Sequence, residues 1–368
     1  MLTRLKIHFK NFDWLILISV ILLLAFGLVE IYSVALGQEK FSLLNFQKQL
    51  LFSGVGLMLL FIFSFIDAHF LKSSKRYIYI FGIILLISVL VFGSVNRGTK
   101  GWFDLLGFGI QPVEFVKIIL ILFLAGFLSD LATKVKTFKH FFLSGLSALF
   151  LIGLVLLQPD FGSALMLGAI WLIMLIAAGF PKKYLIIIGA SVAIVLMLAW
   201  LFFFKTYQRE RIMTFINPAA SSLESGWNIS QAMIAVGSGG LVGKGVGFGS
   251  QSQLKFLPEA QNDFIFAVIA EELGLLGVLL ILGFYGLFFY RCLSALKKVT
   301  NDFGIYFIIG AVGLIFIQMF INIGMNIGIM PVVGLPLPFV SYGGSSLLSL
   351  LILVGIIENI IIKSKTSY

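Results

Sequence analysis

Ten long apolar stretches, separated by polar segments, run through the 368-residue sequence. A helix needs about 20 mostly apolar residues to cross a bilayer, so each stretch predicts a transmembrane helix. The expected spans are Trp14–Leu36, Leu50–Ile66, Tyr77–Val95, Val113–Leu128, Phe141–Leu157, Phe161–Gly179, Tyr184–Phe204, Phe264–Tyr290, Ile305–Ile329 and Val340–Ile362. Only 11% of the residues are charged, against about 25% in an ordinary soluble domain. The sequence therefore predicts an all-α polytopic membrane protein, with a single domain over residues 1–368.

The positions of lysine and arginine predict how the chain crosses the membrane, because cytoplasmic loops are enriched in both. With both termini in the cytoplasm, 16 of the 26 basic residues lie in the inner segments. They are Arg4, Lys6, Lys10, Lys72, Lys75, Arg76, Lys134, Lys136, Lys139, Lys182, Lys183, Arg291, Lys297, Lys298, Lys363 and Lys365. We therefore expect cytoplasmic termini and a large extracytoplasmic loop, Lys205–Asn262, between helices 7 and 8.

Other features of composition exclude several classes of protein. The net charge of +10 is explained by the cytoplasmic loops, and no nucleic-acid-binding module is found. The basic N-terminus precedes an apolar run without a small-residue cleavage site, so we expect a retained first span. Cys292 is the single cysteine, which excludes an intramolecular disulfide framework.

Asp263 stands where a polar, glycine-rich segment meets the apolar run of the eighth span. In the predicted orientation this border faces the extracytoplasmic side. A carboxylate there can contact water and a lipid-held molecule together. No other acid in the sequence lies so clearly at such a border.

Three further ionisable residues lie near the outer ends of spans. Glu114 and Lys117 are three residues apart, so they share one helix face. They form either a helix-end ion pair or a cation that faces a cavity, with Glu114 orienting Lys117. Asp160, between two spans, suits the N-cap of the sixth helix, which does not exclude a second role.

Several patterns have a structural reading as well as a functional one. Gln318, Asn322 and Asn326 recur every four residues, a pattern typical of hydrogen bonds between helices or of a cavity lining. Glu271 and Glu272 follow Asp263 deeper in the eighth span, and we expect them to pair inside the bundle. The glycine-rich run from Val236 to Ser250 does not fit the phosphate-loop pattern, so it is either a surface turn or a backbone that packs on a ligand.

The predicted location of the site limits the reaction. ATP is not available outside the cytoplasm, so a bond-forming enzyme there needs an activated substrate. Lipid-diphosphate sugars fit, because the diphosphate leaves without a general acid and one carboxylate base suffices for the acceptor hydroxyl. Cations on the outer side that could hold a diphosphate are Arg97, Lys100, Lys117, Arg209, Arg211, Lys244 and Lys255.

Six stretches, which together extend over most of the chain, resemble the SEDS family of RodA, FtsW and SpoVE. They are NRGTKGW at 96–102, QPVEFVK at 111–117, QPDFGSA at 158–164, SGGLVGKG at 238–245, LPEAQNDFIFAVIAEELG at 257–274 and NIGMNIGIMPVVGLPLPFVSYGGSS at 322–346. The resemblance implies a ten-span fold and a peptidoglycan glycosyltransferase that polymerises lipid II into β-1,4 glycan strands. The MPVVGLPLPF stretch and the short termini favour a RodA-like role in cell elongation and shape.

The resemblance also implies roles for particular residues. Asp263 matches the catalytic acid, and the expected substrate-binding residues are Glu114, Lys117, Asp160, Arg211, Lys244 and Glu259. Val113 replaces the usual Ser, and Gln261 and Asn262 replace His and Thr, which puts the hydrogen bonding of the acid in doubt. The sequence names no certain cofactor and leaves a divalent cation open.

The implied setting is the bacterial cytoplasmic membrane, with lipid II, membrane lipid and a class B penicillin-binding protein as partners. Three other functions stay open at this point. The chain could be a flippase for lipid-linked precursors, an FtsW-like division polymerase, or a scaffold for the elongation or division machinery. A flippase needs a polar route through the bilayer, whereas a polymerase needs a site at one face.

Overall fold

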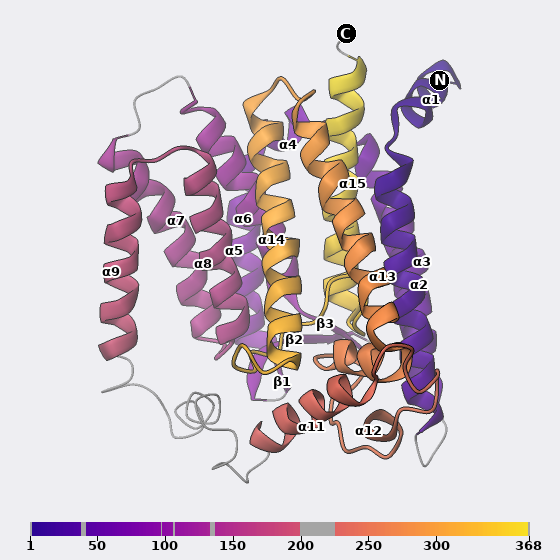
Figure 1. Ribbon diagram of the computed structural model, residues 1–368. Coiled ribbons are helices and arrows are strands. Elements are labelled where there is room, and N and C mark those ends of the chain that lie inside the picture. The colour runs from indigo at the N-terminus through magenta and orange to yellow at the C-terminus, as the bar shows by residue number, and fades with distance from the viewer. Residues whose placement is uncertain are drawn as a thin grey trace.

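The computed structural model describes residues 2–37, 42–96, 98–105, 107–132, 137–198 and 225–366. Long helices run side by side, and both termini lie at one end of the bundle (Figure 1). The helices are α1 (Leu2–Asn11), α2 (Trp14–Leu36), α3 (Leu44–Phe65), α4 (Ala68–Ser73), α5 (Lys75–Phe92), α6 (Pro112–Ser129), α7 (Phe138–Leu156), α8 (Phe161–Ala177), α9 (Lys182–Leu198), α11 (Ser225–Ser238), α12 (Ser250–Gln253), α13 (Ile265–Leu296), α14 (Asp302–Asn326) and α15 (Gly344–Thr366). The strands are β1 (Ser94–Asn96), β2 (Thr99–Leu105) and β3 (Phe108–Ile110).

Every predicted span contains a long helix, which confirms the all-α polytopic membrane fold. Within the described residues, 8 helices are long and apolar enough to cross a membrane, namely α2, α3, α5, α6, α7, α13, α14 and α15. Helix α8 is apolar but shorter, and α9 has 17 residues. The predicted boundaries differ by a few residues, since α3 begins at Leu44 and α13 continues to Leu296.

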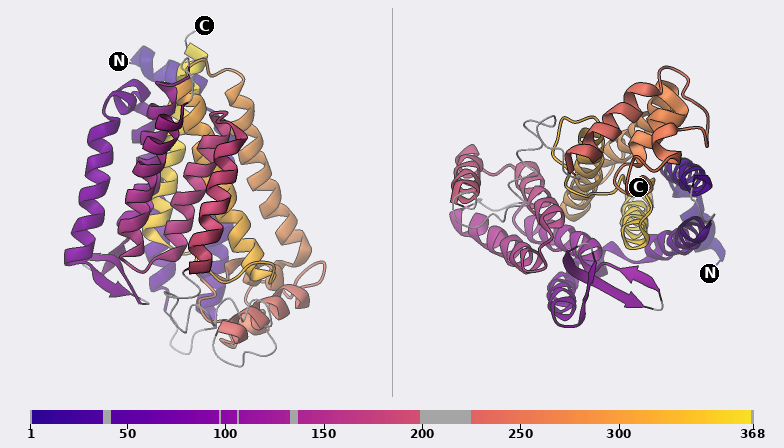
Figure 2. Two further views of the ribbon diagram at one scale, coloured as in Figure 1. Left: turned by 90° about the vertical axis from the view of Figure 1, so that its left-hand side faces the viewer. Right: turned by 90° about the horizontal axis from the view of Figure 1, so that it is seen from below.

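The burial of the spans places α15 and α6 inside the bundle and α5 at its edge. Within the membrane-spanning window, 89% of α15 and 78% of α6 are buried, against 17% of α5. Helix α15 packs against α3, α6 and α14, and the view from below shows it surrounded by other helices (Figure 2). Most of the buried residues of α15 are apolar, and a helix that is apolar around most of its circumference can be buried in this way.

A small antiparallel sheet, β1-β2-β3, lies at the end of the bundle away from the termini (Figure 1). The sequence predicted an outer loop after the third span and no strands. The sheet is tied to the last helix by Ser345, whose hydroxyl oxygen accepts from the Gln111 N–H at 2.9 Å and donates to the Gly109 carbonyl at 3.2 Å. Residues that enter α6 are thereby fixed to the start of α15.

Helix α13 is broken at Gly274, whose φ of 64° and ψ of −161° are not helical. The glycine-rich segment supplies the missing hydrogen bonds. The Lys244 and Gly245 N–H groups donate to the Glu271 and Glu272 carbonyls at 3.0 and 2.9 Å. In return, the N–H groups of Leu275 and Leu276 donate to the carbonyls of Gly240 and Leu241 at 2.9 and 3.1 Å. Backbone polar groups within a membrane span must be satisfied by protein, and here a neighbouring segment does so.

This arrangement explains why the segment is rich in glycine. From the sequence, it could be either a surface turn or a backbone that packs on a ligand. A Cβ atom at Gly239 would overlap the Ala270 carbonyl, and one at Gly243 would overlap the Glu272 carbonyl. The run is glycine-rich because it packs against the backbone of the broken helix.

We predict that Gly274→Ala destabilises the protein by about 1–3 kcal/mol, because only glycine adopts this backbone conformation without strain. A Cβ there would also overlap Gly243 and Leu241. The matched control is Gly283→Ala on the same helix, where a Cβ meets nothing within 4 Å. Thermal unfolding in detergent should show a lower Tm for the first variant only. Equal Tm values would mean that the break does not require glycine.

Candidate functional site

Asp263 lies directly before α13, at the end of the bundle opposite the termini, and its side chain is half-buried. Its main-chain carbonyl accepts two hydrogen bonds of 3.0 Å, from the Nδ2 atoms of Asn322 and Asn326. Asn326 also accepts from the Ala267 N–H at 3.2 Å, a donor in the first turn of α13 that also bonds to the Phe264 carbonyl at 3.0 Å. Two amides of α14 therefore fix the backbone that carries the candidate catalytic acid.

The polar residues of α14 also hold the segment that follows it, residues 330–341. Asn322 donates to the Leu335 carbonyl at 2.7 Å, and Gln318 donates to the Pro336 carbonyl at 3.1 Å. The stripe was predicted to make hydrogen bonds between helices or to line a cavity. Its buried side chains do make hydrogen bonds, but their partners are backbone groups of a loop and of the start of a helix. The stripe sets the position of both sides of the candidate site.

Residues 330–341 lie beside both Asp263 and the start of α8. A Cβ at Gly334 would stand 3.5 Å from Oδ2 of Asp263, so the backbone of Gly334 lies beside the carboxylate. At the neighbouring position, the Val333 carbonyl oxygen would be 3.1 Å from a Cβ at Gly162, in the first turn of α8. The segment thus lies between the two candidate acids, Asp263 and Asp160.

Asp160 is the N-cap of α8, as the sequence predicted. Its Oδ1 accepts from the Ser163 N–H at 2.9 Å, and its Oδ2 accepts from the Ser163 hydroxyl at 2.7 Å. Gln111, at the N-cap of α6, donates from Nε2 to the same Oδ2 at 2.9 Å. The carboxylate therefore joins the starts of α6 and α8, and a second role in substrate binding stays a prediction.

Glu114 and Lys117 form an ion pair in the first turns of α6, with Nζ 2.8 Å from Oε1. The side chains are 7% and 1% exposed. The pairing was predicted, and the burial means that each charge depends on the other for its compensation.

We predict that Lys117→Met alone costs about 3–5 kcal/mol of stability, because it leaves the Glu114 carboxylate buried and unpaired. The double variant Glu114→Gln/Lys117→Met should recover most of that loss, since no net charge is then buried. Thermal unfolding of the two single variants and the double variant completes the cycle. Additive losses in the double variant would show that the two side chains do not compensate each other.

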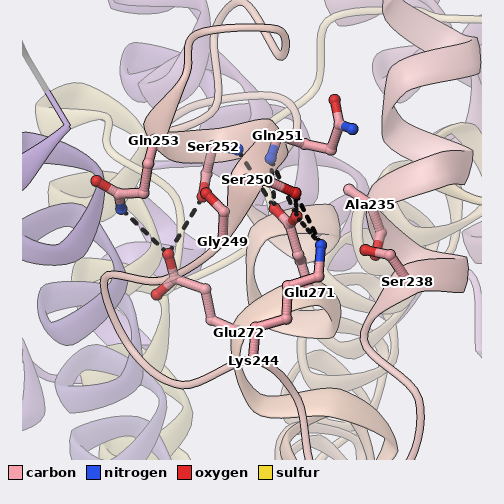
Figure 3. A network of polar contacts seen from close by, with 10 residues as sticks. All are labelled: Ala235, Ser238, Lys244, Gly249, Ser250, Gln251, Ser252, Gln253, Glu271 and Glu272. Atoms are coloured by element: carbon pink, nitrogen blue, oxygen red, sulfur yellow. Dashed lines mark hydrogen bonds and ion pairs between the residues drawn. The ribbon is translucent and has the colours of Figure 1, made fainter.

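Lys244 belongs to a polar network around the two glutamates of α13 (Figure 3). Its Nζ is 2.8 Å from both Glu271 Oε1 and Ser250 Oγ. Glu271 also accepts the N–H groups of Gln251 and Ser252, at 3.0 and 3.3 Å, which caps the short helix α12. Two of the three ammonium hydrogens of Lys244 are directed into this network, and 30% of its side chain stays exposed.

Glu272 has its own partners in the same region. Its Oε2 accepts from the Ser33 hydroxyl at 2.5 Å and from the Gly247 N–H at 2.9 Å. Its Oε1 accepts from Ser252 and Gln253 at 3.2 and 3.3 Å. Glu272 therefore links the first span to the loop. The two glutamates were expected to pair inside the protein, and their partners are donors from the loop and from the first span.

Two of the predicted substrate-binding residues remain, Glu259 and Arg211. Glu259 is exposed, has a φ of 54°, and accepts from Asn262 Nδ2 at 2.6 Å. Arg211 lies outside the described residues. Gln261 and Asn262 differ from the family pattern. Gln261 Oε1 accepts from Asn45 Nδ2 at 2.7 Å, and Asn262 Nδ2 donates to Glu259. No group of three or more metal-binding side chains occurs within the described residues.

The contribution of α3 to this end of the molecule was not predicted from the sequence. Gln49, which is 1% exposed, donates to the Ser341 carbonyl at 3.1 Å and accepts from the Gly343 N–H at 3.2 Å. The Ser341 hydroxyl in turn donates to the Asn262 carbonyl at 2.5 Å. A glutamine in the first turns of an apolar span was the signal that could have indicated this anchor.

Comparison with known proteins supports the resemblance. A family model described as a cell cycle protein, FtsW/RodA/SpoVE, matches residues 13–366. Stage V sporulation protein E of Bacillus subtilis (strain 168) is 36% identical over 360 residues, which cover 95% of this chain and 96% of that protein. Peptidoglycan glycosyltransferase MrdB of Escherichia coli (strain K12) is 36% identical over 359 residues, with 96% and 94% covered.

A solved structure has the same architecture over nearly the whole chain. It belongs to a peptidoglycan synthase complex studied for the coordination of polymerization and crosslinking. The match has a TM-score of 0.80 and 29% identity, and covers 97% of this chain and 98% of that chain.

Proposed function

We infer the function from one premise: this chain belongs to the FtsW, RodA and SpoVE family of cell cycle proteins. It is a membrane-embedded peptidoglycan glycosyltransferase, in line with the relatives that carry this name. We propose that it polymerises lipid II, as both donor and acceptor, into β-1,4 glycan strands at the outer face of the bacterial cytoplasmic membrane. The RodA-like stretch at 330–339 favours a role in elongation and cell shape over an FtsW-like role in division.

The placement of Asp263 is the observation that supports this proposal best. Its carboxylate is half-buried at one end of the bundle, and its main chain is held by Asn322 and Asn326. In this role the carboxylate takes the proton from the acceptor hydroxyl as that oxygen attacks the anomeric carbon of the donor. The donor diphosphate leaves as a weak base, so the reaction needs no general acid.

We also propose substrate-binding roles for six further residues of the sequence. Arg211 would contribute positive charge to the donor diphosphate. The Glu114–Lys117 pair would act without direct contact, since its side chains are 7% and 1% exposed. Lys244 donates two of its ammonium hydrogens to Glu271 and Ser250, and its third would donate to a phosphate oxygen. Asp160 and Glu259 would accept hydrogen bonds from sugar hydroxyls.

The distribution of charge supports the proposed orientation of the site. The end of the bundle with the termini carries most of the described basic residues, which are Arg4, Lys6, Lys10, Lys72, Lys75, Arg76, Lys139, Lys182, Lys183, Arg291, Lys297, Lys298, Lys363 and Lys365. The opposite end has Lys48, Lys100, Lys117, Lys244 and Lys255 in the described part of the chain. Basic residues favour the cytoplasmic side, so Asp263 would face outward.

The proposed partner is a class B penicillin-binding protein, which would crosslink the new strand. The similarity to a chain of a peptidoglycan synthase complex supports such an assembly.

We predict that a cysteine at Phe248, which is 76% exposed within the glycine-rich segment, reacts with a membrane-impermeant thiol reagent in intact cells. The background is Cys292→Ser, because that buried cysteine is the only native one. Thr300→Cys, in the exposed connection between α13 and α14, is the control at the opposite end and should react only after lysis. The reverse pattern of labelling would overturn the orientation.

We predict that Asp263→Asn lowers the rate of lipid II polymerisation by about 10²–10⁴, since an amide cannot accept the proton. The matched control is Asp104→Asn, which changes an exposed carboxylate in β2 and should leave the rate unchanged. Both variants should insert in the membrane and unfold at the parent Tm. Polymerisation at the parent rate by Asp263→Asn would refute the assigned base, and rescue by added divalent cation would make the residue a metal ligand.

A further inference from the structure

An open cavity of ≈ 630 Å³ lies at the end of the bundle that carries the termini, far along α6 from the candidate catalytic site. Its lining residues are His69, Lys72, Ser73, Lys75, Arg76, Tyr77, Ile80 and Asp130. Three of these side chains are cations and one is a carboxylate, so the cavity keeps an excess of positive charge. Nothing in the proposed glycosyl transfer uses these residues.

The cations are held in place by the end of α6. Lys75 Nζ donates to the Gly126 carbonyl at 2.8 Å and forms an ion pair with Asp130. Lys72 Nζ donates to the Ser129 hydroxyl at 2.8 Å and lies 3.5 Å from Asp130. Partial burial acts to raise the pKa of Asp130, but the bonds from Lys75 and Lys72 hold it below its usual value. The carboxylate is therefore charged and fixes the two lysines.

Arg76 completes the positive side of the cavity. It is exposed, and it makes no ion pair within the part of the chain that the structure describes. Lys75 and Arg76 are also the first two residues of α5, so the positive end of a long helix opens into the same space. Guanidinium and ammonium groups at a helix start are the groups that bind phosphate in proteins.

An apolar surface continues from the cavity along α5. Tyr77, Ile80, Phe81 and Ile84 are 78%, 52%, 56% and 57% exposed. Their spacing of three and four residues places them on one face of the helix. Because α5 is a candidate membrane span that is only 17% buried, this face contacts lipid. The cavity thus lies where the span begins, with cations at the surface and an apolar stripe below.

We propose that this cavity binds an anionic phospholipid, with the phosphate on Lys72 and Arg76 and the acyl chains along the exposed face of α5. The shared chemistry is a phosphate group, and the stripe favours a lipid over a soluble phosphate. Each basic residue near an anionic lipid surface contributes about 1 kcal/mol, so two together give an effect of about thirtyfold in affinity.

The test measures binding of dioleoylphosphatidylglycerol to the delipidated full chain in detergent, by native mass spectrometry and by the lipid-dependent rise in Tm. Lys72→Gln/Arg76→Gln should weaken binding by about thirtyfold. Lys72→Arg/Arg76→Lys, which keeps both charges, should bind to within a few-fold of the parent. Lys297→Gln/Lys298→Gln is the matched control, because it removes two exposed charges at the same end and should leave binding unchanged.

Three results would overturn the proposal. One is equal binding of phosphatidylglycerol by the parent and by Lys72→Gln/Arg76→Gln. Another is an equal loss in the Lys297→Gln/Lys298→Gln control, which would show a general effect of surface charge. The third is displacement of phosphatidylglycerol by inorganic phosphate, which would identify a soluble-anion site.

Discussion

The hydrogen bonds from Asn322 and Asn326 to the Asp263 carbonyl determine the geometry of one whole end of the molecule. Asn326 also accepts from the Ala267 N–H in the first turn of α13, so it contacts the start of that helix as well as Asp263. The same helix, α14, holds residues 330–341 through Asn322 and Gln318. A residue at the end of a loop is thereby positioned by a rigid membrane span, which is the arrangement that a precise proton transfer requires.

The break in α13 gives the first part of that helix a second anchor. Residues 265–273 are held at their start by α14 and at their end by the backbone of residues 240–245. Because Glu271 and Glu272 lie just before the break, their carboxylates can bond to the loop and to Ser33 of the first span. The segment that follows Asp263 is therefore fixed on three sides, and its polar residues serve the structure of the loop.

The fold could be predicted from the sequence because membrane spans depend mainly on length and hydrophobicity. The positions of particular side chains depended on their partners. The spacing of Asp160 before α8 was enough to predict a cap, and the spacing of Glu114 and Lys117 was enough to predict a pair. The sheet and the broken α13 were not predictable, because residues distant in sequence complete their hydrogen bonds. The partner of Lys244 was not predictable for the same reason, since it is a glutamate 27 residues away in the sequence.

Helix α6 shows how a chain with few charges uses them to set the depth of a span. A charged side chain at the centre of a bilayer costs about 2.5–3.5 kcal/mol, so charges are tolerated where they are paired or near an end. In α6 the buried pair Glu114–Lys117 lies near the start, and Asp130 with its two lysines lies just beyond the other end. The apolar stretch between them, from Ile118 to Leu128, is almost entirely buried, so it gives no preference for one depth over another. The polar groups at the two ends therefore fix the axial position of α6, and with it the Gln111 side chain that bonds to Asp160.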